Sequence, residues 1–237
     1  MLAISSGKGG VGKSTVSVSL AVALAKSGLR VGLMDTDIYG PNVPGMLGVA
    51  EKPQVDPETG KIVPAQAHGV HLISMGMLVD AGVPVIWRGP MLAKMMSQFL
   101  FQVDWGELDV LLLDLPPGTG DVQISLTQTA PLTGAVIVTT PSQLALEDVA
   151  RGVRMFRETE VPLLGLIENM GGFVCSSCQQ ESHPFGHGGG EAAAERFKMP
   201  FLGNVPLEPA VRAGADTGTP SILASPDAPA SKALSAI

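Results

Sequence analysis

The two cysteines of the chain lie close together, at Cys175 and Cys178, in the stretch GFVCSSCQQESHPFGHGGG (172–190). Two thiolates at this spacing can bind one side of a metal ion or cluster, which then needs further ligands. His183 and His187 follow in the same stretch and extend the motif to C-x2-C-x4-H-x3-H. A zinc site within one chain is therefore one interpretation of the motif.

Two other interpretations of the cysteine pair need no metal. A redox-active C-x-x-C is expected at the start of a helix that follows a strand, whereas this pair follows NMGGF in a predicted loop. Buried structural cysteines are common, but the neighbouring SSCQQESH is polar. The polar setting favours an exposed and labile site over a buried one.

A phosphate-binding pattern lies near the start of the chain. The stretch SGKGGVGKST (6–15) fits G-x-x-x-x-G-K-[ST], follows an apolar run and precedes a helical pattern. Glycines let backbone N–H groups surround phosphates, and the following helix adds its dipole. We expect Lys13 to neutralise phosphate oxygens and Ser14 to ligate Mg²⁺. The predicted nucleotide-binding loop is Gly7, Lys8, Gly9, Gly10, Val11, Gly12, Lys13, Ser14 and Thr15.

Aspartates follow two apolar runs. LMDTDIYGPNVP (33–44) contains Asp35 and Asp37, and LLLDLPPGTGD (111–121) contains Asp114. A carboxylate directly after a buried strand is typical of a group that holds Mg²⁺ beside a phosphate loop, so Asp114 is assigned that role. Asp35 is a further candidate. The chain has no N-K-x-D guanine signature, and this favours ATP over GTP.

These groups need a sheet that brings strand ends together. Continuous apolar runs are typical of parallel strands buried on both faces. They recur at residues 2–5, 30–35, 70–75, 109–116, 135–140, 163–170 and 200–206. Helical patterns occupy Lys13–Ser27, Pro90–Val103, Val122–Thr129, Leu144–Glu158 and Gly190–Phe197. The alternation predicts an α/β fold with a doubly wound, mostly parallel sheet flanked by helices, the P-loop NTPase fold, in one domain over 1–237.

Three further segments are not assigned to the predicted sites. Residues 50–66 are expected to form a hairpin or loop, and the Pro/Ala/Ser-rich tail (224–237) is expected to be peripheral. The methionine-rich stretch 87–100 fits a helix that packs against the core better than a partner-docking helix.

The composition excludes several classes of protein. Hydrophobic residues make up 45% of the 237, enough for a large core, and the net charge of −7 argues against nucleic acid or an anionic membrane as partner. We find no transmembrane pattern, signal peptide or disulfide framework. The expected compartment is the cytoplasm.

Several segments together resemble one family. SGKGGVGKST, DTDIYGPNVP, WRGPM (87–91), LLLDLPPGTGD, GLIENMGGFVCSSC and FGHGGGE occur in the order seen in the Mrp (ApbC-type) P-loop ATPases. These resemble carriers or scaffolds for iron–sulfur clusters, and they share a deviant phosphate loop with MinD, ParA and nitrogenase iron protein. Many members carry a small domain before the phosphate loop, whereas this chain has six residues before Gly7.

The resemblance implies roles for individual residues. Lys8 would reach across a homodimer to the partner's nucleotide, and Asp37 would position the attacking water. With Lys13, these are the predicted catalytic residues. Asn169 and Pro206 would contact the adenine.

The resemblance also implies what the cysteines hold. A twofold axis would combine Cys175 and Cys178 of two subunits into four thiolates, the ligand set of a bridging [4Fe–4S] cluster, for delivery to apo iron–sulfur proteins. Zinc in the same four-thiolate site is an alternative. A MinD/ParA-like dimerisation switch, with structural zinc or no metal, is the alternative function. A metabolic ATPase would need a further substrate-binding signature, which we do not find.

Overall fold

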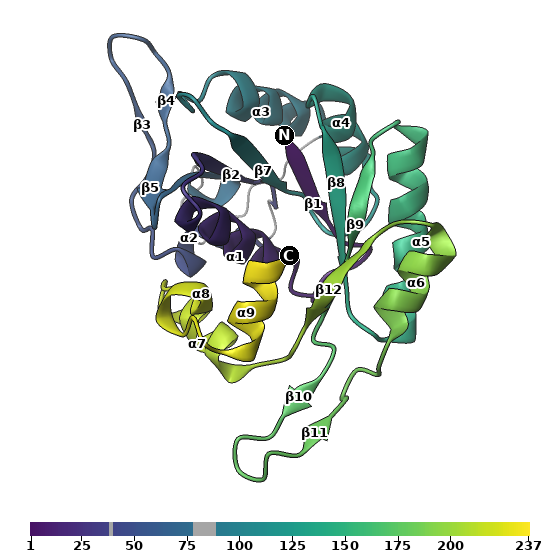
Figure 1. Cartoon of the computed structure of the whole chain (residues 1–237). Coiled ribbons are helices and arrows are strands. Elements are labelled where there is room, and N and C mark those ends of the chain that lie inside the picture. Colours follow the sequence, from purple (N-terminus) through teal and green to yellow (C-terminus); the bar gives the residue numbers. More distant parts are fainter. Residues whose placement is uncertain (38–39, 78–88) are drawn as a thin grey trace.

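A mostly parallel sheet forms the centre of the computed structural model, which describes residues 1–37, 40–77 and 89–237 (Figure 1). Across the described residues the strand order is β12-β9-β8-β1-β7-β2-β6-β5. All neighbouring pairs are parallel except β5 (Ala65–Ala67), which is antiparallel to β6. The other strands are β1 (Leu2–Ser5), β2 (Val31–Asp35), β6 (Val70–Ser74), β7 (Val110–Asp114), β8 (Gly134–Thr139), β9 (Leu163–Asn169) and β12 (Phe201–Val205).

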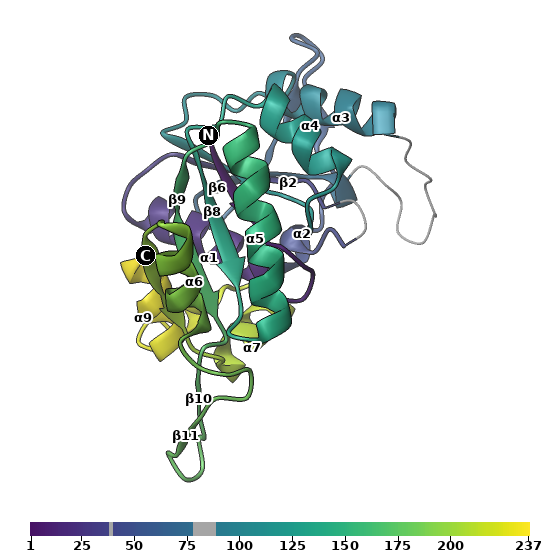
Figure 2. The ribbon, with the colours of Figure 1, turned by 90° about the vertical axis from the view of Figure 1, so that its right-hand side faces the viewer.

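Helices cover both faces of this sheet (Figures 1 and 2). One face carries α3 (Gly89–Phe101), α4 (Asp121–Thr129), α5 (Gln143–Glu158) and α6 (Gly189–Phe197). The other carries α1 (Lys13–Lys26), α2 (Val43–Met46), α7 (Pro209–Asp216), α8 (Ser221–Ala224) and α9 (Pro229–Ala236). A 3-10 turn, η1 (Met75–Met77), follows β6.

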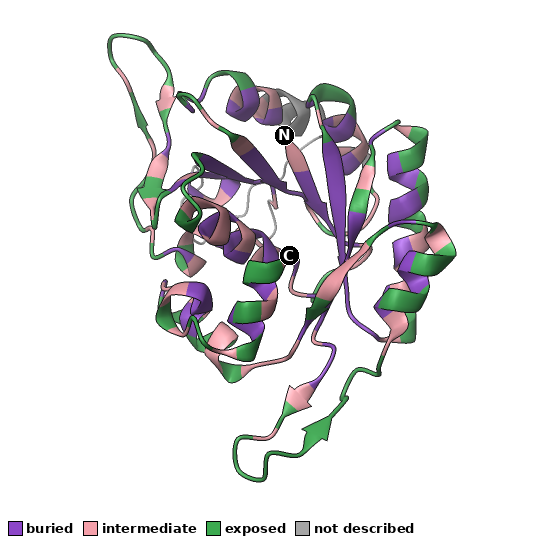
Figure 3. Ribbon diagram, in the orientation of Figure 1, coloured by how far each residue is buried: buried purple, intermediate pink, exposed green. Residues whose placement is uncertain are grey.

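The core has two layers because successive strand residues point to opposite faces. In β7, Leu113 packs under α3 and α4, whereas Leu112 packs under α1. Both faces are apolar, so the central strands are buried along most of their length (Figure 3). This arrangement confirms the predicted doubly wound fold, and each predicted helix lies within two residues of an observed one.

The methionine-rich stretch packs against the core, as expected. Met96, Phe99 and Leu100 of α3 are buried in the layer beneath that helix. Trp87 and Arg88 of the WRGPM motif, and residues 38–39 of DTDIYGP, lie outside the described residues.

The prediction of a peripheral tail is wrong. Within α9, Ala230 and Leu234 are 0% and 1% exposed, and the helix packs against α1 and β12. Apolar residues spaced three and four apart (Ala230, Ala233 and Leu234) form one helix face, which the Pro/Ala/Ser-rich composition concealed. The short helices α2, α7 and α8 were also not predicted.

In the described part of the chain, two hairpins leave the sheet. The predicted excursion at 50–66 contains β3 (Gln54–Val55) paired with β4 (Ile62–Val63). The second hairpin, β10 (Phe173–Val174) with β11 (Glu181–Ser182), projects away from the body of the molecule (Figures 1 and 2). Among the described residues, no helix has the length and apolar character needed to cross a bilayer.

Candidate nucleotide and cysteine sites

The predicted site residues meet at one edge of the sheet. Because the strands are parallel, their carboxyl ends lie together, and ligands of such sheets bind where the connections diverge to either side. β1 ends at the phosphate loop, β2 at Asp35, β7 at Asp114, β9 at Asn169 and β12 just before Pro206. Since β1 lies between β8 and β7, the phosphate loop occupies this point of divergence.

The phosphate loop requires glycine where it turns into α1. Gly10 and Gly12 have φ angles of 82° and 81°, in the left-handed region that favours glycine. A Cβ atom on Gly12 would lie 2.2 Å from Nδ2 of Asn169. Nδ2 of Asn169 donates to the carbonyl of Val11 at 2.9 Å, so the end of β9 holds the loop in place.

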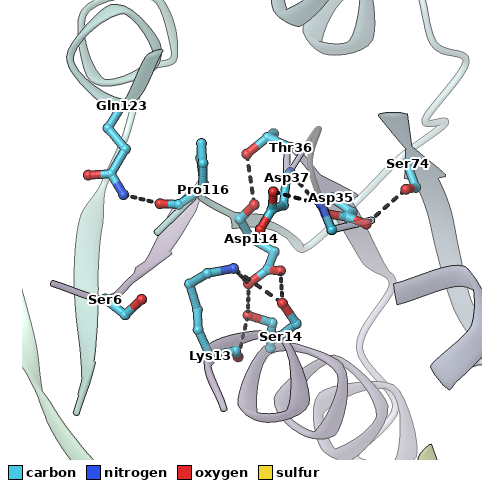
Figure 4. A network of polar contacts seen from close by, with 12 residues as sticks. Ser6, Lys13, Ser14, Asp35, Thr36, Asp37, Ser74, Asp114, Pro116 and Gln123 are labelled. Carbon is cyan, nitrogen blue, oxygen red and sulfur yellow. Dashed lines mark hydrogen bonds and ion pairs between the residues drawn. The ribbon is translucent and has the colours of Figure 1, made fainter. Parts of the chain in front are cut away.

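Asp114 joins the phosphate loop to the strand ends (Figure 4). Its Oδ1 lies 2.7 Å from Nζ of Lys13, and its Oδ2 accepts the hydroxyl of Ser14 at 2.7 Å. Lys13 is 6% exposed and Asp114 is fully buried. The Ser14 hydroxyl and the Asp114 carboxylate are hard oxygen donors that face each other, which is the donor chemistry that Mg²⁺ prefers.

Sequence reasoning missed the hydroxyls that support these aspartates. Ser17 donates to Oδ1 of Asp114 at 2.5 Å, and Thr36 donates to the Asp114 carbonyl at 2.7 Å. Ser74 of β6 donates to Oδ2 of Asp35 at 2.8 Å. Ser17 lies one helical turn after Lys13, and this spacing is the one signal in the sequence that could have identified it.

Asp35 is a fully buried carboxyl group beside Asp114 (Figure 4). Burial, followed by the nearby charge of Asp114, raises the pKa of Asp35 to about 7. Its Oδ1 accepts the backbone N–H of Asp37 at 3.1 Å. Asp37 is partly exposed and its Oδ1 accepts the N–H of Gly40 at 3.2 Å.

Several other residues of the phosphate loop are at least partly exposed to solvent. Gly9 and Gly10 are exposed, while Gly7, Lys8 and Thr15 are partly exposed. The carbonyl of Lys8 accepts the Ser6 hydroxyl at 3.0 Å. Within the described residues, no ion pair involves the ammonium group of Lys8.

The predicted adenine contacts also lie together. Val205 pairs with Asn169 across β12 and β9, so Pro206 follows immediately beside the end of β9. Asn169 is 7% exposed and Pro206 is partly exposed.

The cysteines occupy the tip of the β10–β11 hairpin. The N–H of Cys175 donates to the Gln180 carbonyl at 3.0 Å, and the N–H of Gln179 donates to the Cys175 carbonyl at 2.9 Å. Cys175 is partly exposed and Cys178 is exposed. The backbone N–H groups of Cys178 and then Ser177 hold the pKa of the Cys175 thiol below its ordinary value, which favours the metal-binding thiolate.

The structure does not assemble the zinc site within one chain. His183 and His187 contact each other with ring centroids 4.6 Å apart, and Nδ1 of His183 lies 3.1 Å from the Gly171 carbonyl oxygen. In the described part of the chain, no group of three or more His, Cys, Asp or Glu side chains is placed to hold a metal ion. The cysteines also lie in a hairpin turn and not at the start of a helix.

The strand–loop–helix with Lys13 and Ser14 against a strand-end aspartate defines a P-loop NTPase. A family model described as the ParA group's NUBPL iron-transfer P-loop NTPase matches residues 1–237. The chain therefore belongs to the ParA/NUBPL family of iron-transfer P-loop NTPases. This finding confirms the resemblance inferred from the motifs.

Curated relatives support the same family. The chain is 51% identical to an iron-sulfur cluster carrier protein of Synechocystis over 100% of this chain and 68% of that protein. It is 52% identical to one of Deinococcus radiodurans over 99% and 66%, respectively. An Arabidopsis thaliana iron-sulfur protein required for mitochondrial NADH dehydrogenase is 48% identical over 98% and 74%. The chain thus spans about two thirds to three quarters of these relatives.

Solved structures show the same fold. A nucleotide-binding protein of Archaeoglobus fulgidus, solved in complex with ADP, is 38% identical with a TM-score of 0.81, over 92% of this chain and 85% of that one. The cell division ATPase MinD of Pyrococcus furiosus, at 23% identity, has a TM-score of 0.74 over 99% and 94%. The MinD likeness concerns the fold alone.

Proposed function

We propose that this protein is an ATP-binding and ATP-hydrolysing iron–sulfur cluster carrier that works as a homodimer. Its family and the names of its relatives support the carrier role. The observation that carries the proposal is the placement of Cys175 and Cys178 at the exposed tip of a hairpin that leaves the same sheet edge as the phosphate loop. An exposed thiol pair can accept a cluster and give it up again.

The residues at the sheet edge fit Mg²⁺ and a nucleotide triphosphate. Ser14 and Asp114 would hold Mg²⁺, the carboxylate through water, and the metal would supply charge neutralisation at the phosphates. Lys13 faces the same carboxylate and would pair with phosphate oxygens when they enter the loop. Asn169 and Pro206, next to each other at the strand ends, would border the adenine.

Hydrolysis needs groups that stabilise charge and orient water. Lys13 would stabilise charge from within the subunit, and Lys8, which forms no ion pair in the described part of its own chain, would do so across the dimer. Asp37 is partly exposed at the end of β2 and would orient the attacking water. A site completed by a second subunit makes hydrolysis depend on dimerisation.

The cargo would bridge two subunits. Each chain supplies two thiolates, and a twofold axis doubles them to the four that a [4Fe–4S] cluster requires. Apo iron–sulfur proteins would be the recipients. Nucleotide binding can drive loading or release only where the nucleotide-bound and free states differ in affinity for the cluster.

Anaerobic reconstitution tests the proposal. The purified full chain is incubated with iron and sulfide, and its absorption spectrum, iron, sulfide and zinc contents are measured beside those of Cys175→Ala, Cys178→Ala and Ser176→Ala. Broad absorbance near about 400 nm with about four irons per dimer is expected, lost in both cysteine variants. Ser176→Ala changes the same turn without removing a thiol and should behave as wild type.

Two results would contradict the proposal, one for the carrier function and one for the cysteine site. Tightly bound zinc with no uptake of iron and sulfide would make the hairpin a structural zinc site. Cluster uptake that survives both cysteine substitutions would place the cargo elsewhere. The first result would favour the MinD/ParA-like dimerisation switch, whereas the second would reject Cys175 and Cys178 as the cluster ligands.

A further inference from the structure

Glu168 is a buried carboxylate that the proposed chemistry does not use. It lies next to the last residue of β9 and is 1% exposed. Oε2 accepts the N–H of Gly190 at 2.5 Å, and Oε1 accepts Nδ2 of Asn204 at 3.0 Å. No ion pair to Glu168 occurs in the described ranges. Because a buried carboxylate is costly unless its oxygens accept hydrogen bonds, these two contacts hold it in place.

Glu168 and its neighbour Asn169 act on opposite faces of the sheet. Successive strand residues point in opposite directions, so Glu168 faces α6 while Asn169 faces the phosphate loop. Asn169 donates to the Val11 carbonyl of that loop at 2.9 Å. Two consecutive residues of β9 therefore contact the phosphate loop and the start of α6.

The cysteine loop, defined as residues 171–190, is attached at its two ends to the neighbouring strand ends of β12 and β9. On its way out, the N–H of Gly171 donates to the Val205 carbonyl at 3.2 Å. Gly171 also packs closely against Asn204, since a Cβ atom at Gly171 would lie 2.2 Å from Nδ2 of that side chain. On its return, the N–H of Gly190 donates to Glu168.

We infer that Glu168, together with Asn204, positions the cysteine loop and transmits nucleotide occupancy of the phosphate loop to it. This inference rests on the proposed function only in that a nucleotide binds the phosphate loop. Binding there stabilises the end of β9 through Asn169, and Glu168 passes that stabilisation to both ends of the cysteine loop. The coupling is a difference in local opening free energy, and hydrogen exchange measures such a difference.

Three variants, two at Glu168 of β9 and one at Glu191 of α6, separate the contacts. Glu168→Ala removes both acceptors. Glu168→Gln keeps both contacts but only one acceptor. Its amide oxygen can accept the Gly190 N–H, and its NH₂ can donate to the Asn204 oxygen once the Asn204 amide turns over. Glu191→Ala removes an exposed carboxylate from the first turn of α6 without touching Glu168, and serves as the matched control.

The experiment is amide hydrogen exchange of the full chain with and without saturating Mg–ADP, resolved by peptide. In wild type, Mg–ADP should slow exchange about fivefold or more at residues 7–15 and also in the cysteine loop. In Glu168→Ala, the slowing at 7–15 should remain while that in the cysteine loop falls to less than about twofold. Glu168→Gln and Glu191→Ala should match wild type.

The possible failures are distinguishable. Slowing in the cysteine loop that persists in Glu168→Ala, or that is missing in wild type despite slowing at 7–15, overturns the inference and leaves the nucleotide site intact. No slowing at 7–15 in wild type overturns the nucleotide site and this inference with it. If Glu168→Ala does not fold, Asn204→Ala, which replaces an exposed side chain, should show a smaller loss of the same kind.

Discussion

At the scale of single residues, the contacts of Asp114 dominate the site. Its carboxylate is fully buried beside the nearly buried ammonium of Lys13, and two serine hydroxyls donate to it. Removing two charges from water is costly, and the mutual attraction offsets this only while both partners are present. Loss of one partner should therefore affect folding as well as nucleotide chemistry.

Lys13→Ala and Lys8→Ala are expected to separate these two effects. Lys13→Ala should lower the free energy of unfolding of the nucleotide-free chain by about 3 kcal/mol, because it leaves the Asp114 carboxylate buried without its cation. Lys8→Ala should change it by less than about 0.5 kcal/mol, since Lys8 is partly exposed and has no ion pair in the described structure. Both should reduce ATP hydrolysis by about 100-fold or more. Urea denaturation measures the free energy of unfolding, and phosphate release measures ATP hydrolysis. Equal losses of stability in Lys13→Ala and Lys8→Ala would contradict the assigned role of Lys13 as the buried partner of Asp114.

Asp35 should make stability depend on pH. Its pKa is raised to about 7 in the folded chain from an ordinary value of 3.8, so the folded state binds more protons between these pH values. Stability of the nucleotide-free protein should therefore fall as pH rises from about 4 to about 7, at up to about 1.4 kcal/mol per pH unit from this group. Asp35→Asn should remove that slope in urea denaturation.

Asp109→Asn is the matched control for this slope. The Arg30 side chain, followed by its backbone N–H, lowers the pKa of exposed Asp109 to about 2 from 3.8. This group therefore contributes no slope between about pH 5 and 7, the part of the Asp35 window in which the two variants are compared. A slope that is unchanged in Asp35→Asn, or one that is removed by Asp109→Asn, would contradict the assignment.

The sequence identified those site residues that belong to a short motif or directly follow a recognisable run of residues. Lys13 and Ser14 belong to one short motif, and Asp114 follows a run of leucines. Glu168 carries no such signature, and Ser17 has only its spacing of one helical turn from Lys13, because a single serine in a helix or glutamate in a strand is common. Their partners, Asp114 and Gly190, lie 97 and 22 residues away, so only the folded chain reveals these contacts.

At the scale of helices and strands, the extent to which an element is buried and its length determine whether the sequence predicts it. Strands such as β8 are buried on both faces and form continuous apolar runs, which made the sheet predictable. The two-residue strands β10 and β11 are too short for any periodicity, so the cysteine segment was expected to be a loop. The tail was misjudged by its composition, although α9 completes the apolar layer beside α1 and β12.

Leu234→Ala tests whether α9 belongs to the core. Leu234 is 1% exposed in the layer that contains α1, so its truncation should lower the free energy of unfolding by about 2–4 kcal/mol. Lys232→Ala, on the exposed side of the same helix, should cost less than about 0.5 kcal/mol. Chemical denaturation compares them. Similar, small effects of both substitutions would show that the tail is peripheral after all.

At the scale of the whole molecule, one sheet edge bears both sites. The phosphate loop follows β1, and the cysteine hairpin follows β9 two strands away in the sheet. The hairpin projects clear of the body (Figures 1 and 2), which suits the proposed contact between two copies. Because one chain offers two cysteines, the proposed four-thiolate site would require two chains, and a single sequence cannot show it.

Native mass spectrometry of the anaerobically reconstituted protein tests the central claim most directly. The account predicts a species of two chains plus one cluster of about four irons and four sulfides, with monomer alone when Cys175 and Cys178 are both replaced by alanine. A monomer that retains iron and sulfide, or a dimer that holds only zinc, would contradict a bridging cluster.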